Sequence, residues 1–145
     1  MYLIALLTAF AAGVLMAFQG SLNTGLGKII GLLASTFFVH AIGTAAMTIL
    51  LLIMKGESKA GKLTDVPWYL YLGGILSVVI IYAVATSISR IGVAAATTAI
   101  IVGQVGTALA IDHFGCFGLE KIPFTWIKAV GVACLALGGW LMLAK

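Results

Sequence analysis

Charged side chains are scarce in this sequence. They make up 8% of its 145 residues, whereas hydrophobic residues make up 63%, and the mean hydropathy is +1.23. A soluble domain needs polar and charged groups to cover its surface, so this scarcity excludes an ordinary soluble globule. We expect lipid to surround most of the chain. The net charge of +4 does not indicate a nucleic-acid partner, because no basic stripe alternates with aromatic residues.

Acidic residues are missing from the middle of every long apolar run. Asp112 and Glu120 lie at or beyond the end of the fourth run. Proton antiport of cationic drugs usually needs a carboxylate embedded in the membrane, which binds the cation and the proton in turn. The absence excludes that mechanism here and favours a neutral polar or anionic solute.

Metal-ligand patterns and catalytic constellations are also missing. Asp112 and His113 are adjacent, but two neighbouring residues cannot supply three or four ligands. Cys116 and Cys134 have no metal-ligand spacing, and we expect free thiols. No nucleophile–base arrangement or phosphate-binding loop is present. We therefore expect no metal, no cofactor and no enzymatic activity.

Long apolar runs, by contrast, recur through the chain. A spanning helix needs about 20 mostly apolar residues, and hydrocarbon excludes open sheets because their backbone groups stay unpaired. We expect an all-α integral membrane protein, a single transmembrane domain over residues 1–145. Pro67 and Pro123, each followed by aromatic residues, are expected to open the third and fifth helices at the membrane interface. The predicted helices cover residues 2–26, 31–54, 67–89, 92–112 and 123–144.

Basic residues give only a weak bias between the two sides of the membrane. Lys55, Lys59, Lys62, Lys121 and Lys128 lie on the side of the amino terminus, and Lys28, Arg90 and Lys145 lie on the other. The positive-inside rule then places the amino terminus in the cytoplasm. So small a difference also fits insertion in both directions and pairing of inverted copies as a homodimer. Alternatively, it reflects noise over short loops.

Polar residues at membrane depth are the candidates for a binding site, since burying them costs free energy. In QGSLN, Gln19 and Asn23 lie four residues apart and share a helix face if the first helix continues past Phe18; otherwise the stretch is a turn. The candidate substrate-binding residues are Gln19, Asn23, His40, Tyr82, Thr97 and Gln104.

His40, Gln104 and Tyr82 also have a structural interpretation. His40 belongs to a stripe with Thr36, Thr44 and Thr48. The threonines could instead bond carbonyl groups of the preceding turn, and His40 could cap a neighbouring helix. Gln104, between Gly103 and Gly106, could bridge helices. Tyr82, which is paired with Thr86 at a spacing of four residues, could be a packing residue.

Three stretches carry a resemblance to a known family: QGSLN at 19–23, RIGVAAATTAIIVGQ at 90–104 and DHFGCFGLEKIPFTW at 112–126. With the five-helix layout they resemble the YdcZ-like family of bacterial inner-membrane proteins, placed in the drug/metabolite transporter (DMT) superfamily. The resemblance implies one half of a ten-helix transporter, working as a pair and often with opposed orientations. The related four-helix multidrug exporters carry a glutamate in their first helix, which this sequence lacks.

These observations together predict a small secondary transporter in the bacterial inner membrane. It moves a small polar or anionic metabolite, as a dimer that is parallel or antiparallel, by alternating access. Two other functions fit the same sequence. One is a narrow channel for a small ion or neutral solute, and the other is a structural partner subunit without transport of its own.

Overall fold

The computed structural model describes residues 1–54 and 60–144, and within these ranges it is helical with no strand. Five helical segments in the described part are long and apolar enough to cross a membrane, which confirms the predicted all-α membrane fold. Lys55, Lys59 and Lys145, which enter the predicted charge bias, lie outside the described residues. The elements are α1 (Tyr2–Ile30), α2 (Leu32–Ile53), η1 (Ala60–Asp65), η2 (Trp68–Tyr71), α3 (Leu72–Ile91), α4 (Val93–Phe114), η3 (Cys116–Gly118) and α5 (Trp126–Leu143).

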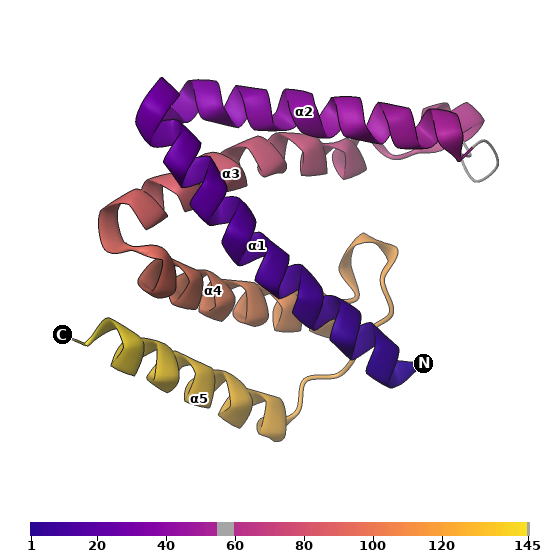
Figure 1. The fold of residues 1–145 in the computed structure, drawn as a ribbon. Helices are drawn as coiled ribbons and strands as arrows, with labels where there is room; N and C mark the ends of the chain where they lie inside the picture. The colour runs from indigo at the N-terminus through magenta and orange to yellow at the C-terminus, as the bar shows by residue number, and fades with distance from the viewer. Residues whose placement is uncertain (55–59, 145) are drawn as a thin grey trace. The chain divides into compact units, whose positions relative to one another are not determined.

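The chain divides into two compact units, Met1–Thr86 and Ser87–Lys145. In the first unit, α1 packs against α2, and the two helices diverge from a sharp corner (Figure 1). In the second unit, α4 packs against α5. Each of these pairs is formed by helices that are consecutive in the sequence.

Helix α1 is longer than the sequence pattern predicts, because it continues past residue 26 to Ile30. The hydroxyl groups of Ser21 and Thr24 donate to the carbonyl oxygens of Ala17 (2.9 Å) and Gly20 (2.7 Å), so the polar stretch stays helical. The helix ends at Gly31, whose φ of 88° interrupts the helical backbone. Since α2 begins at Leu32, a single residue joins two potential membrane spans.

The starts of the third and fifth spans differ in their relation to proline. Pro67 directly precedes the short helix η2, so the third span begins at Trp68 as its position suggests. Helix α5 instead begins at Trp126, three residues after Pro123. Thr125 is extended and caps the helix, because its side-chain oxygen accepts from the Lys128 N–H at 3.4 Å. Threonine is a favourable N-cap, and the cap determines where the helix begins.

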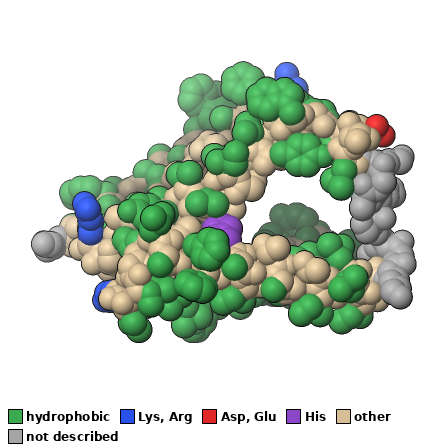
Figure 2. All heavy atoms as spheres, turned by 90° about the horizontal axis from the view of Figure 1, so that it is seen from above, with side chains coloured by type: hydrophobic (Ala, Val, Ile, Leu, Met, Phe, Trp, Pro, Cys, Tyr) green, Lys and Arg blue, Asp and Glu red, His purple; other side chains and the backbone are tan. Residues whose placement is uncertain are grey.

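Apolar side chains face outward over most of the described surface. Phe10, Leu33 and Ile53 are each about 70% exposed or more, and three apolar residues in the described part are buried, namely Ala85, Ile88 and Ala96. Figure 2 shows a face covered mostly by apolar side chains, with few charged groups. This distribution is the reverse of that in a soluble protein and suits a lipid surrounding.

Candidate functional site

Four polar residues are buried beside the corner between α1 and α2. Asn23 and Thr24 lie before Gly31 in the chain, and Ser35 and Thr36 lie after it; between 1% and 7% of each residue is exposed. We call these four residues the polar corner. In a chain whose apolar residues face outward, a buried polar group of this kind is the clearest inward-facing feature of the first unit.

The two helices approach closely at the polar corner because residue 27 is a glycine. A Cβ atom at Gly27 would lie 2.6 Å from Leu32 Cδ2 and 3.3 Å from Ser35 Oγ. The first distance is shorter than any ordinary carbon–carbon contact. Small residues allow membrane helices to pack this tightly and to gain van der Waals contact.

Within the polar corner, the hydroxyl groups and the amide differ in their hydrogen bonding. Thr24, Ser35 and Thr36 each donate to a carbonyl oxygen of their own helix, at 2.7–3.0 Å. The Asn23 amide forms no side-chain hydrogen bond with a described residue, and the described part contains no buried side-chain nitrogen or oxygen without a partner. The side-chain nitrogen and oxygen of Asn23 are therefore not fully buried, although 93% of the surface of the residue is covered.

Gln19 lies one turn before Asn23 on α1 and is exposed. The helix does continue through QGSLN, so the condition for placing Gln19 and Asn23 on one face is met. Their surroundings nevertheless differ, since only Asn23 is buried.

The hydroxyl stripe of α2 bonds largely within its own helix. Thr36 donates to the Leu32 carbonyl (2.8 Å) and Thr48 to the Thr44 carbonyl (2.9 Å). This is the structural interpretation given above for the threonines. It satisfies their hydroxyl groups without help from a solute or another helix.

His40, in the same stripe, connects two helices. Its Nδ1 lies 2.8 Å from the Thr36 carbonyl oxygen, and its Nε2 lies 3.1 Å from Ser77 Oγ on α3. The histidine and the serine are both half-buried. The sequence singled out His40 but not Ser77, although Ser77 is the only hydroxyl-bearing residue between Leu72 and Ile81.

Tyr82 lies further along α3 in the first unit. It is 43% exposed, and its carbonyl oxygen accepts a hydrogen bond from the Thr86 hydroxyl at 2.8 Å. The predicted pairing of Tyr82 with Thr86 is thus a local bond of the helix, and it leaves the phenol ring on an exposed face.

The remaining candidates lie on α4 in the second unit. Thr97 is half-buried, and Gln104 is exposed near the middle of the helix. A Cβ atom at Gly103 or Gly106 would meet nothing within 4 Å. The amide of Gln104 therefore stands beside two positions with open space around the helix backbone.

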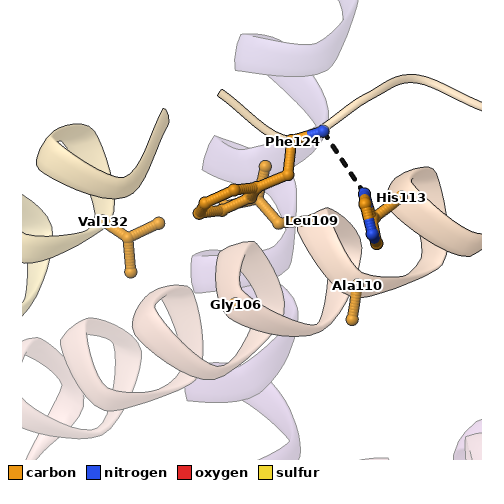
Figure 3. Close-up of a pocket in the computed structure, with 6 residues that line it drawn as sticks. All are labelled: Gly106, Leu109, Ala110, His113, Phe124 and Val132. Carbon is orange, nitrogen blue, oxygen red and sulfur yellow. Dashed lines mark hydrogen bonds between the residues drawn. The ribbon is translucent and has the colours of Figure 1, made fainter. Parts of the chain in front are cut away.

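Two hollows lie between α4 and α5, and neither contains Thr97 or Gln104. The first, of about 440 Å³, is drawn in Figure 3 and is mostly apolar. In it, His113 Nδ1 accepts a hydrogen bond of 3.4 Å from the Phe124 N–H, which ties the end of α4 to the segment before α5. The second, of about 450 Å³, is lined by Thr98 and small residues of α5 such as Gly138. The lining of both suits lipid or a neighbouring helix better than a polar solute.

The structure thus assigns the candidates to separate places. Gln19, Asn23, His40 and Tyr82 belong to the first unit, and Thr97 and Gln104 to the second. Thr24, Ser35 and Ser77 are polar residues near the candidates that sequence reasoning did not select. Among the described residues, no three His, Cys, Asp or Glu side chains are grouped as they would be around a metal ion.

A family model described as "Putative inner membrane exporter, YdcZ" matches residues 4–141. Comparisons with curated proteins and with solved structures give no match. The family match spans nearly the whole chain and confirms the resemblance carried by the three sequence stretches.

Proposed function

The chain belongs to the YdcZ family of inner membrane exporters, and on this premise we propose that it is a small secondary transporter for a small polar or anionic metabolite. In this proposal the five spanning helices act as one transmembrane domain. Two copies, with opposed orientations, form the transport path between them. Rocking of the helix bundles opens the path to one side of the membrane at a time, as in other transporters built from inverted repeats.

Gln104 is the observation that carries this proposal. Its amide is exposed near the middle of a helix long enough to span the membrane. Moving an amide from water into hydrocarbon without a hydrogen-bond partner costs about 4–8 kcal/mol. A second copy or a polar solute at this depth would remove that cost.

Asn23 supports the same function from the first unit. Asn23 is buried, but its amide nitrogen and oxygen are still accessible and have no hydrogen-bond partner among the described residues. An amide offers both donors and acceptors and carries no charge, so it suits a neutral polar or an anionic solute. Both amides would line the path, together with Gln19, His40, Tyr82 and Thr97.

The test is a solute screen on purified full-length protein in liposomes. Currents on a solid-supported membrane report charge-moving transport of zwitterions, small carboxylates and neutral polar compounds, with and without a pH gradient. Radiolabelled counterflow detects electroneutral transport. We expect saturable flux that drives countertransport. Flux that stays linear with concentration and drives no countertransport indicates a channel. Transport that needs a second protein indicates a partner subunit.

Substitution of Gln104 tests the site. Gln104→Ala should raise the half-saturating solute concentration about three- to tenfold, because one hydrogen bond contributes about 0.5–1.5 kcal/mol. Thr8→Ala is the control, since the Thr8 hydroxyl donates to the Ile4 carbonyl of its own helix and no candidate residue lies in that turn of α1. If Gln104→Ala and Asn23→Ala both transport like the parent, the site is wrongly placed.

A further inference from the structure

The hydrogen bonds around His40 form a chain that leads from α2 to α3. The imidazole Nδ1 faces the Thr36 carbonyl oxygen at 2.8 Å, and Nε2 faces Ser77 Oγ at 3.1 Å. The Ser77 hydroxyl in turn lies 2.7 Å from the Gly74 carbonyl oxygen. All four residues belong to the first unit.

Counting hydrogens along this chain limits the protonation states. A carbonyl oxygen only accepts, so Nδ1 must carry a hydrogen to bond Thr36. The Ser77 hydroxyl has a single hydrogen, which it can give either to the Gly74 carbonyl or to His40 Nε2. When it bonds Gly74, its oxygen is left to accept, and the bond to His40 then requires a hydrogen on Nε2.

Two complete arrangements follow from this count. In the neutral one, Ser77 donates to a bare Nε2. In the charged one, Nε2–H donates to Ser77, and Ser77 donates to Gly74. Gain of a proton at Nε2, together with rotation of the Ser77 hydroxyl group, converts the neutral arrangement into the charged one, and no side chain has to leave its place. The site therefore accommodates a proton at Nε2 without losing a bond of the imidazole.

The protonated form of His40 has no acidic neighbour among the described residues of the first unit. The titratable groups on the elements beside α2 are Tyr2 and Lys28 on α1 and Tyr82 and, in the last turn, Arg90 on α3, with Tyr69 and Tyr71 in η2. None of them is hydrogen-bonded to His40 in the described part. Residues 1–54 and 60–86 include one acidic residue, Asp65, which lies outside α1, α2 and α3. A positive charge at membrane depth therefore favours an anion supplied by the solute.

We propose that His40 is the proton-binding site that couples transport to the pH gradient. The Ser77 hydroxyl rotates so that its oxygen accepts a hydrogen bond from the protonated Nε2. The proton binds at Nε2, and the imidazolium then holds an anionic solute by charge. This role rests on the transport function proposed above, whereas proton binding itself does not.

Nuclear magnetic resonance tests proton binding without any solute. Full-length protein labelled with ¹⁵N-histidine is titrated in lipid bilayers, and His113→Asn leaves His40 as the only labelled residue. We expect Nδ1 to stay protonated throughout and Nε2 to gain a proton as the pH is lowered from 9 to 4.5. An Nε2 signal that stays unchanged from pH 9 to pH 4.5 overturns the inference, even if the protein transports.

The Ser77 partner has its own test in the same titration. Ser77→Ala should shift the Nε2 resonance in both protonation states, because the hydroxyl bonds this atom in each. Ser21→Ala, whose hydroxyl donates to the Ala17 carbonyl on α1, should leave it unchanged. A Ser77→Ala spectrum identical to that of the parent contradicts the proposed switch.

Flux measurements test the coupling role. For any compound of the panel that the parent moves, His40→Gln should lower flux driven by a pH gradient by about tenfold or more. The variant should elute from a size-exclusion column in detergent at the volume of the parent, which shows that it is folded. Gradient-driven flux at the parent rate overturns the coupling. If Nε2 titrates but the parent moves no solute in any condition, the proposed transport function fails and the proton site stands.

Discussion

Hydroxyl and amide side chains of single residues play different parts in the spanning helices. Thr8, Thr24, Thr48 and Thr98 each donate to the carbonyl oxygen four residues earlier, at 2.7–2.9 Å. Such a bond satisfies the hydroxyl inside its own helix. In the proposed transporter, we therefore expect the solute to be bound by the amides and by His40, whose bonding is not completed within one helix.

How far single residues could be predicted depends on the range of the contact. The bond from Thr36 to the preceding turn follows from helix geometry alone, so spacing was sufficient to suggest it. The partner of His40 lies 37 residues away. That pairing depends on the register of α2 against α3, which periodicity does not encode.

Gly27 offers a test of the close approach at the polar corner. Gly27→Ala puts a methyl group within 2.6 Å of Leu32 Cδ2, and overpacking of this kind costs about 1–3 kcal/mol. Gly25→Ala on the same helix meets nothing within 4 Å and should gain helix propensity. We expect Gly27→Ala to unfold at a lower temperature in detergent than Gly25→Ala. Equal melting temperatures would show that Leu32 moves aside without cost.

At the scale of elements, the corner between α1 and α2 and the corner between α3 and α4 have the same backbone conformation. Gly31 joins α1 to α2 with φ 88° and ψ 146°, and Gly92 joins α3 to α4 with φ 84° and ψ 166°. The N–H group of each donates to the carbonyl oxygen four residues earlier, at 3.0 Å. Only glycine adopts this region readily, so these positions connect the helices through conformation rather than packing.

Gly31→Ala tests the corner between α1 and α2. The Cβ atom has free space there, so the expected cost of about 1–3 kcal/mol comes from the backbone alone. Gly43→Ala, inside α2 with nothing within 4 Å, is the matched control and should be neutral or stabilising. The measurement is thermal unfolding in detergent by circular dichroism. A Gly31→Ala variant as stable as Gly43→Ala would contradict the strain.

The existence of the five spans could be predicted from the sequence, but their ends less well. Apolar length alone indicates a span, whereas ends depend on local hydrogen bonds. The sequence pattern predicted an end of the first helix near residue 26, yet α1 continues to Ile30 and ends at Gly31, whose φ of 88° interrupts the helical backbone. In the last span, the cap at Thr125 rather than Pro123 determines the start.

For the whole molecule, the distribution of basic residues fits insertion in both directions, which the proposed inverted pair requires. Five basic residues against three is a small difference, and orientation follows this bias. Two reporters can be fused to the carboxyl terminus. Alkaline phosphatase is active only when this terminus lies outside the cytoplasm, and a fluorescent protein is fluorescent only when it lies in the cytoplasm. Both fusions should give signals within about tenfold of each other. Lysines added between α2 and η1 increase the charge bias, so all copies of the protein should then insert in one orientation. A single active reporter in the parent would contradict an inverted pair.

The one-residue corners also have a consequence for how the protein is made. A single glycine is too short to let one helix insert into the bilayer while the other stays in water. Helices α1 and α2 must therefore enter the bilayer together, as a hairpin. The same holds for α3 and α4. Lys28 and Arg90 lie in the last turns before these corners and travel with the hairpin tips. Orientation is then decided once for each pair of helices, and a single charge at a tip acts on both members together.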